Sequence, residues 1–466
     1  MSAKPDEAPT LCTIVARNYL AHARALTESF RIQHPDGRVI VLLVDRVNGD
    51  VDPAAEPFEL IEAEALGIPA FGDMAFRYSV LELSTAVKPF FLEYLMERRG
   101  IDRLIFLDPD IYLYAPLAPV FDALETAEVA LTPHLLRPLE SDGVPSDLDI
   151  LRSGVYNLGF IAVRRGPNVR RLLRWWQRKL EKACVRAMEQ GLFVDQRWAD
   201  LIPAFVAEVA ILRHPGLNVA YWNLPNRRPV WSGDRWQVDG WPLVFYHFSG
   251  LQLDDLDAIS THQSRFTLAD RPELRPLFEG YRARLLANDY ERVRSLPYAY
   301  GHFDNGVPIP EAARRLWQSL GGAESRWSDP LGTTAADSFF QFLNESVAPS
   351  DSGGQLTQLA LAYYNLRADL QAAFPDVLGS DRLGYLAWFV TEKDCRQALD
   401  PVFIDPVEES LAPAPDIPEI RTPLSARLYF AVRNPMVRLG MERLVRRVLG
   451  SRRVDAIYEW MVRPIP

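Results

Sequence analysis

Two acidic residues stand two positions apart in the segment IDRLIFLDPDIYLYAPL, directly after an apolar run. In a regular strand the side chains of Asp108 and Asp110 point to the same face, and the intervening Pro109 ends regular pairing there. Mg²⁺ and Mn²⁺ prefer carboxylate oxygens and take diphosphate oxygens as further ligands. The pair therefore predicts a divalent-metal site that neutralises the charge on a departing nucleoside diphosphate. The competing interpretation is an acidic strand-to-loop turn that binds nothing.

A histidine follows a second apolar run, in the segment PLVFYHFSG. A neutral imidazole at His247 could be the third metal ligand, and Ser249-Gly250 is a small pair that lets phosphate oxygens approach the backbone. The alternative is an ordinary buried or capping histidine. Because ligands of α/β sheets gather at the carboxyl ends of strands, two polar strand ends favour one shared site.

The elements that must position these residues are short apolar runs that alternate with helical stretches, a pattern typical of an α/β sheet. We expect strands over 11–16, 38–45, 103–107, 157–164, 209–213 and 244–248. We expect helices over 19–34 and, interrupted at Pro89, over 81–98. Residues 136–153 have the composition of a long loop, and long loops in compact domains often carry function.

The character of the chain changes near residue 290. We expect an α/β domain over 1–290, a helical region over 291–400, a proline-rich linker over 401–423 and a basic amphipathic helical tail over 424–466. A basic helix of this kind either packs on the acidic body of the chain or lies on an anionic membrane.

Composition narrows the function classes. The chain has 466 residues, of which 48% are hydrophobic and 24% charged, as in globular proteins. Its formal charge of −10 disfavours a nucleic-acid binder, because phosphate contacts need a basic surface. Three distant cysteines argue against a disulfide framework and fit a reducing compartment. Without a signal-like start or an apolar run of about 18 residues, we expect a cytoplasmic protein, with peripheral contact at the inner membrane through the tail.

Residues 11–255 resemble the retaining GT-A nucleotide-sugar glycosyltransferases of the glycogenin and bacterial lipopolysaccharide galactosyltransferase type. Six segments carry the resemblance in the family's order. They are the opening strand and turn with Ala16, Asn18 and Tyr19; Lys88 in STAVKPFFLEYL; Asp108 and Asp110; Tyr156-Asn157-Leu158-Gly159; Asp195-Gln196; and His247-Phe248-Ser249-Gly250.

The resemblance implies a Rossmann-like, three-layer α/β/α nucleotide-sugar domain. It implies a hexosyltransferase that moves a sugar from a nucleoside diphosphate sugar, most readily UDP-linked, to a glycan or lipid-linked acceptor with retention, using Mn²⁺ or Mg²⁺. The implied roles are metal binding by Asp108, Asp110 and His247, donor binding by Ala16, Asn18, Tyr19, Lys88, Asp108, Gly159 and Gly250, and catalysis around the donor sugar by Asn157, Asp195 and Gln196.

These residues also have ordinary structural interpretations. Lys88 could be a surface lysine with a buried stem, Tyr19 could pack at a helix start, and Asp195 could be an acid favoured at a helix N-terminus. The tryptophans at 222, 231, 236 and 241 could be core anchors, or their faces could stack on an acceptor sugar.

One departure from the family concerns the diphosphate. The family often continues its His-Phe-x-Gly motif with Lys-Pro-Trp, whereas this chain continues with Leu251-Gln252-Leu253-Asp254-Asp255. The contact to the diphosphate must therefore come from elsewhere, and Arg265 is a candidate.

Two other functions fit parts of the sequence. Haloacid-dehalogenase-type phosphatases place Asp-x-Asp after a strand near the start of the domain, with Thr or Val two residues after the second Asp. Here Tyr112 stands at that position. A catalytically inactive sugar-nucleotide-binding or assembly protein would keep the same ligands. A turnover assay separates the three, because only a transferase consumes a sugar nucleotide.

Overall fold

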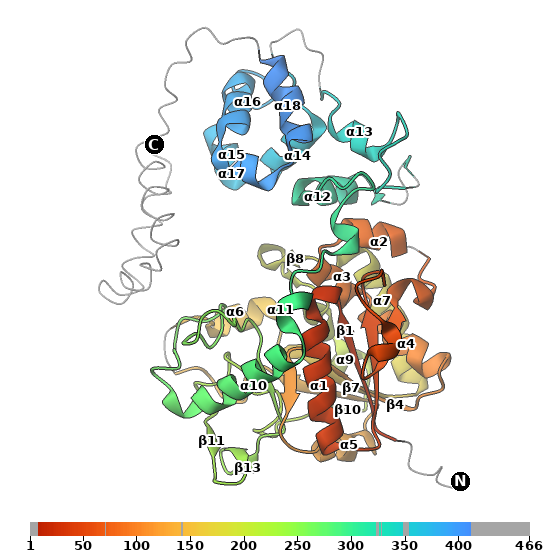
Figure 1. Cartoon of the computed structure of the whole chain (residues 1–466), viewed down its shortest axis with the longest axis vertical. Coiled ribbons are helices and arrows are strands. Elements are labelled where there is room, and N and C mark those ends of the chain that lie inside the picture. Colours follow the sequence, from red (N-terminus) through yellow and green to blue (C-terminus); the bar gives the residue numbers. More distant parts are fainter. Residues whose placement is uncertain are drawn as a thin grey trace. The chain divides into compact units, whose positions relative to one another are not determined.

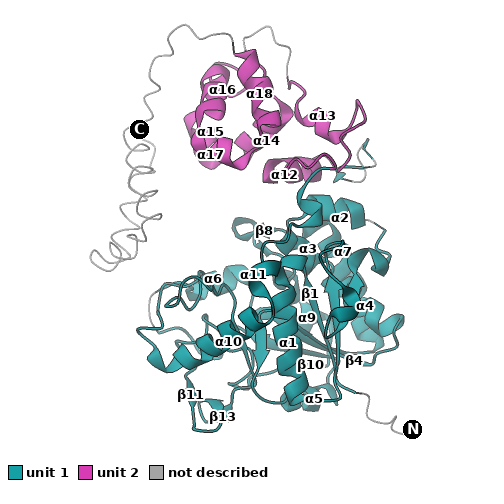
Figure 2. Cartoon of the chain, viewed as in Figure 1, with its two compact units in different colours: residues 1–303, 321–330 teal, residues 304–320, 331–466 magenta. Residues whose placement is uncertain are grey.

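The structure, a computed structural model, describes residues 8–69, 71–140, 143–322, 326–327, 329–347 and 354–411. The chain forms two compact units (Figure 2). Unit 1 comprises residues 1–303 and 321–330, and unit 2 comprises residues 304–320 and 331–466.

A seven-stranded mixed sheet lies at the centre of unit 1 (Figure 1). Its order is β10 (Val209–Ile211), β6 (Val129–Pro133), β7 (Tyr156–Arg164), β4 (Arg103–Leu107), β1 (Thr10–Val15), β2 (Arg38–Leu43) and β3 (Glu59–Glu62). Strand β1 pairs in parallel with both β2 and β4, whereas β7 runs antiparallel to β4 and β6. The sheet and the helical C-terminal region confirm the predicted fold class.

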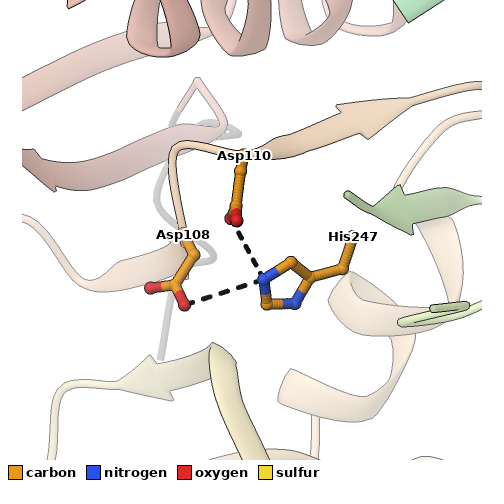
Figure 3. A group of neighbouring side chains, drawn as sticks. All are labelled: Asp108, Asp110 and His247. Atoms are coloured by element: carbon orange, nitrogen blue, oxygen red, sulfur yellow. Dashed lines mark ion pairs between the residues drawn. The ribbon is translucent and has the colours of Figure 1, made fainter. Parts of the chain in front are cut away.

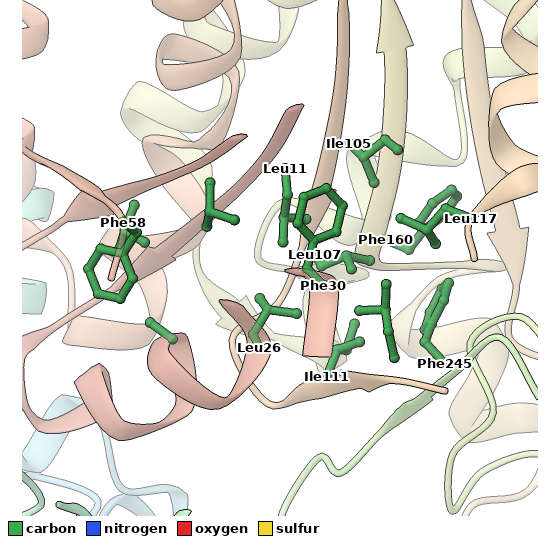
Figure 4. Close-up of a cluster of buried hydrophobic side chains, with 14 of the residues drawn as sticks. Leu11, Leu26, Phe30, Phe58, Ile105, Leu107, Ile111, Leu117, Phe160 and Phe245 are labelled. Carbon is green, nitrogen blue, oxygen red and sulfur yellow. The ribbon is translucent and has the colours of Figure 1, made fainter. Parts of the chain in front are cut away.

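Strand β1 and its neighbours are nearly continuous apolar runs because they are buried on both faces. All six residues of β1 are buried, and so are four of the five residues of β4. Helix α1 (Leu20–Gln33) packs with Ile105 and Leu107 in the core shown in Figure 4. Phe106 instead contacts Lys88, the first residue of α4 (Lys88–Glu97). Since successive strand residues point to opposite faces, α1 and α4 cover opposite faces, which gives three layers.

Smaller strands complete unit 1. Strand β5 (Ile111–Leu113) pairs with β14 (Phe245–His247), β8 (Arg186–Ala187) pairs with β9 (Leu192–Phe193), and β11 (Pro229–Trp231), β12 (Trp236–Val238) and β13 (Trp241–Pro242) form a three-stranded sheet.

The remaining α-helices of unit 1 range from four to 17 residues. They are α2 (Phe71–Arg77), α3 (Val80–Ala86), α5 (Ala118–Leu124), α6 (Asp147–Ser153), α7 (Pro167–Ala183), α8 (Gln196–Ala199), α9 (Ile202–Phe205), α10 (Arg275–Ala287) and α11 (Tyr290–Val293). Single 3₁₀ turns are η1 (Arg17–Tyr19), η2 (Pro53–Ala55), η3 (Ala63–Leu66), η4 (Met188–Gln190), η5 (Pro272–Leu274) and η6 (Ala299–Gly301).

Three local expectations differ from the structure. The helix expected from Tyr19 begins at Leu20, after the 3₁₀ turn. The helix expected over 81–98 is two helices that meet at Val87. The second helix begins there because Pro89 fits its first turn, where a backbone N–H would have no intrahelical acceptor. The loop expected over 136–153 ends in α6, whose start is fixed by a capping box between Ser146 and Asp149.

Unit 2 is helical in its described part. It contains α12 (Glu311–Ser319), α13 (Phe339–Leu343), α14 (Gln358–Asn365), α15 (Ala368–Ala373), α16 (Arg382–Thr391), α17 (Lys393–Ala398) and α18 (Pro401–Ser410). Helix α18 occupies part of the segment expected to be a linker, and it buries Phe403, Ile404 and Val407. Residues 412–466, which include the expected tail, lie outside the described residues. Within the described ranges, no helix is both long and apolar enough to cross a membrane.

Candidate metal centre and its surroundings

Asp108, Asp110 and His247 converge at one point (Figure 3). The Nε2 atom of His247 lies 3.0 Å from Oδ1 of Asp110 and 3.9 Å from Oδ2 of Asp108. One ligand atom from each residue lies within 4.8 Å of the other two. Two carboxylates and an imidazole form a donor set that suits Mn²⁺ or Mg²⁺ and leaves other positions for phosphate or water. We call these three residues the metal group.

The backbone brings the metal group together through two strand pairs. The Asp108 amide donates to the Gly159 carbonyl at 2.8 Å, which holds the end of β4 against β7. The chain then turns into β5, where Ile111 stands opposite His247 of β14. The Phe248 amide donates to the Asp110 carbonyl at 2.9 Å. Asp110 and His247 are therefore cross-strand neighbours whose separation does not depend on an ion.

The three residues of the metal group shift one another's pKa values. Burial raises the pKa of Asp108 to about 6, although Lys88 and His247 oppose this. Burial also works against the charged forms of Asp110 and His247, but their mutual attraction prevails, so the pKa of Asp110 is lowered and that of His247 is raised. A divalent metal held by the two carboxylates and the imidazole would offset the negative charge gathered there.

Gly159 leaves the space that the His247 ring occupies. A Cβ atom at Gly159 would collide with Cε1 of His247 and lie 2.8 Å from both its Nδ1 and Oδ1 of Asn157. Any larger side chain at this position of β7 would therefore displace the imidazole. The glycine of the Tyr156–Gly159 segment is thus required by packing at the metal group.

Lys88 and Asp195 form a buried ion pair behind the metal group. The Lys88 Nζ atom lies 2.6 Å from Oδ2 of Asp195, and it also donates to the Leu158 carbonyl at 2.8 Å. Each side chain is 2% exposed. Burial raises the pKa of Asp195, and Lys88 opposes that rise. Lys88 is therefore a core cation and not a surface lysine.

Asn157 and Gln196 belong to one hydrogen-bonded network. Gln196 Oε1 accepts from Nδ2 of Asn157 at 3.3 Å and from the Leu158 amide at 3.1 Å, and its Nε2 donates to the Ser153 carbonyl. Asn157 Oδ1 accepts from the Gly159 amide and from Nδ2 of Asn218. The network fixes the backbone of β7 next to the metal group.

Tyr19, Asn18 and Ala16 form the turn after β1. Tyr19 is 43% exposed, and its ring stacks on His22 with centroids 4.4 Å apart. Burial raises the pKa of Tyr19 to about 12, and Asp110 adds to the rise, so the phenol lies within electrostatic range of the metal group. Asn18 is half-buried and Ala16 is buried. An exposed aromatic face at this position could stack on a nucleobase.

The tryptophans and Arg265 singled out by the sequence differ in their surroundings. Trp222 packs edge-to-face on His247 with centroids 5.2 Å apart. Trp236 is buried, whereas Trp231 and Trp241 are each 55% exposed. Arg265 donates through Nη2 to the carbonyls of Gly143 and Pro145.

Sequence reasoning missed two members of the network. His134 Nε2 lies 3.3 Å from Nδ2 of Asn157, and its ring packs on Trp222. Asn218 adopts a left-handed backbone, with φ of 50°, and donates to Thr132 and Asn157. Asparagine tolerates this conformation, but no spacing in the sequence indicates it.

No known family profile matches this chain. Two uncharacterized proteins of Bacillus subtilis (strain 168) are similar. YfnF is 26% identical over 277 residues, which cover 58% of this chain and 89% of YfnF. YfnD is 25% identical over 246 residues, which cover 52% of this chain and 77% of YfnD.

Three solved structures are similar in part. The galactosyltransferase LgtC with donor and acceptor sugar analogs is 17% identical, with a TM-score of 0.30 over 46% of this chain and 76% of LgtC. The apo glycosyltransferase GlyE of Streptococcus pneumoniae TIGR4 is 12% identical, with a TM-score of 0.36 over 64% and 67%. Apo mouse xyloside xylosyltransferase 1 is 13% identical, with a TM-score of 0.32 over 51% and 97%.

Proposed function

We propose that this chain is a metal-dependent glycosyltransferase that moves a sugar from a nucleoside diphosphate sugar to a glycan or lipid-linked acceptor. UDP-linked sugars are the first donors to test. The observation that carries the proposal is the metal group at the carboxyl end of β4, where one ligand atom from each residue lies within 4.8 Å of the other two. A divalent ion held there neutralises negative charge on the diphosphate as it leaves.

The surrounding residues would position the donor. Tyr19 presents an exposed ring at the end of β1, where a base can stack. Lys88, Asp195, Asn157 and Gln196 form a buried polar wall whose hydrogen bonds are largely satisfied within the protein. Such a wall is preorganised, so it can orient a sugar without rearrangement. Retention of configuration follows from the family resemblance, and it is part of the proposal.

A thermal-shift screen tests the proposal directly. The full chain is melted with the diphosphates of uridine, cytidine, thymidine, guanosine and adenosine and with their common sugar conjugates, each with and without Mn²⁺. A specific ligand stabilises the folded state by mass action and raises the melting temperature. We expect at least one sugar nucleotide to do so only with the metal present, and to be consumed in a turnover assay.

The variant Asp110→Ala should lose the metal-dependent shift and the turnover while it keeps its fold. Asp122→Ala is the matched control, because Asp122 is an exposed carboxylate on α5. An unchanged shift in the Asp110 variant would contradict the metal assignment. Binding without turnover would favour an inactive binding protein, and phosphate release from simple esters would favour a phosphatase.

Membrane contact through residues 424–466 is a separate proposal that rests on sequence alone. The segment is rich in arginine, and each basic residue near an anionic surface contributes about 1 kcal/mol. Sedimentation with anionic liposomes, comparing the full chain with one ending at Pro415, tests it. Equal recovery of both in the supernatant would refute it.

A further inference from the structure

Among the described residues, the segments that carry the metal group place no exposed basic side chain next to it. Lys88 is committed to Asp195 and to the Leu158 carbonyl, and its side chain is 2% exposed. The five residues after Gly250 are Leu-Gln-Leu-Asp-Asp, which adds two negative charges. A diphosphate bound at the metal group carries more charge than one divalent ion neutralises. Other basic side chains must therefore face it if it binds tightly.

His262 is folded back onto the turn that follows His247. The Thr261 amide donates to the Gly250 carbonyl at 3.0 Å. A Cβ atom at Gly250 would lie 2.7 Å from Cδ2 of His262, so the imidazole lies directly against this glycine. Gly250 has a φ of 71°, in the left-handed region that favours glycine. The His262 side chain is nevertheless exposed to solvent.

A chain of aromatic rings connects His262 to the metal group. The ring centroid of His262 lies 6.0 Å from that of Tyr221, which lies 4.9 Å from that of Trp222. Trp222 in turn packs on His247. His262 is therefore connected to the imidazole of the metal group through two aromatic rings, and it is exposed whereas His247 is buried.

Arg186 approaches the same place from another segment. It begins β8, whose partner β9 ends two residues before Asp195, and Arg186 stands opposite Phe193 in this pair. Its amide is fixed by Oε1 of Glu82 at 3.0 Å, and its side chain is exposed. Burial lowers the pKa of His262, Arg186 lowers it further and Asp110 opposes both. Tyr221 also interacts with Arg186 and Asp110. Arg186 and Asp110 therefore both act electrostatically on His262 and on Tyr221, whose rings are in contact.

We propose that Arg186 and His262 form a rim of hydrogen-bond donors that binds the diphosphate of the donor on the solvent side of the metal group. This proposal rests on the proposed function. A guanidinium donates to two phosphate oxygens at once, and an imidazole N–H donates to a third. Hydrogen bonds fix the backbone of both segments, since the Arg186 amide donates to Glu82 and the Thr261 amide donates to the Gly250 carbonyl.

The test measures ligand binding in the variants Arg186→Gln, His262→Gln and the double variant. Isothermal titration with Mn²⁺ present uses the nucleoside diphosphate that binds the unmodified protein most tightly among those of uridine, cytidine, thymidine, guanosine and adenosine. We expect the double variant to bind it at least tenfold more weakly. Its affinity for Mn²⁺ alone and its melting temperature should be unchanged. Binding should also depend less steeply on salt, because the charged contact from the Arg186 guanidinium is gone.

The matched control is Arg178→Gln combined with His302→Gln, which removes one exposed arginine and one exposed histidine elsewhere in unit 1. This control should bind like the unmodified protein. Arg186→Lys, which keeps the charge, should lose less affinity than Arg186→Gln. If the unmodified protein binds a nucleoside diphosphate and the double variant binds it within twofold, the rim is refuted and the proposed function stands. If the unmodified protein binds none, the proposed function fails and the rim with it.

Discussion

The ammonium group of Lys88 lies 2.6 Å from a carboxylate oxygen of Asp195, and both side chains are 2% exposed. The pair joins the first residue of α4 to the residue that precedes α8. It also lies one residue from the Asn157–Gln196 network, since Lys88 donates to the carbonyl of Leu158. The ion pair therefore connects three segments behind the metal group.

Removing one member of this pair should destabilise the protein strongly. Lys88→Met leaves the Asp195 carboxylate buried without its partner, and such changes lower the free energy of unfolding by about 3–5 kcal/mol. The double variant Lys88→Met with Asp195→Leu removes both charges and should lose less. Urea unfolding followed by circular dichroism measures both. If the single variant is as stable as the double, the pair is not acting as a buried ion pair.

Replacing Gly159 should move the His247 imidazole. Gly159→Ala places a methyl group against the ring, and overpacking of this kind lowers the free energy of unfolding by about 1–3 kcal/mol. We expect Mn²⁺ affinity to fall while the far-ultraviolet dichroism is retained. Gly280→Ala on α10 is the control, because a Cβ there meets nothing within 4 Å. Unchanged Mn²⁺ affinity in the Gly159 variant would show that the ring can adjust.

Removing the metal should lower stability as well as ligand binding. An ion that binds only the folded state at 100 times its dissociation constant adds about 2.7 kcal/mol to the free energy of unfolding. Dialysis against a chelator should therefore lower the melting temperature, and Mn²⁺ should restore it. His247→Ala should abolish the difference between the two states. A melting temperature that does not respond to Mn²⁺ would argue against binding at the metal group.

His134 should make the protein sensitive to mild acid. Burial lowers its pKa from 6.5 to about 4, although carbonyl contacts partly oppose this. Below pH 6.5 the unfolded chain binds a proton that the folded chain does not bind until about pH 4. Stability should therefore fall as the pH drops through this window, by roughly 3 kcal/mol in total from this residue. An NMR titration of the histidine Cε1 protons, assigned with His134→Gln, measures the pKa, and a value near 6.5 would contradict the prediction.

The strand-end argument from sequence predicted that Asp108, Asp110 and His247 share one site, and the structure does place them close together. What the sequence did not show is the pairing of β5 with β14, which brings residues distant in the chain to the end of β4. Asn218 could not be predicted, because its contact with Asn157 depends on a left-handed residue and on a fold-level juxtaposition of β6, β7 and the loop before β14. The functional roles of all these residues stay predictions until the experiments above are done.

The proline-rich segment shows a different limit. Pro401 and Pro406 suggested a linker, yet Asp400 accepts from the Val402 amide and starts α18 with a proline in its first turn. Composition alone could not distinguish this capped helix from an extended linker. The helix is stabilised by the burial of Phe403, Ile404 and Val407. This burial requires neighbouring helices, which no local sequence pattern predicts.

The division of the chain shown in Figure 2 also governs how the protein can be cut into pieces. The chain leaves unit 1 after Phe303, returns for residues 321–330 and leaves again after Pro330. A truncation that stops at Phe303 would remove Trp327, which is buried. It would also remove Gly322, which lies against the side chains of Asp73 and Arg77. A fragment meant to preserve unit 1 must therefore extend to Pro330 and carry α12 with it. For the same reason, one proteolytic cut between 304 and 320 would leave each fragment holding part of the other's unit.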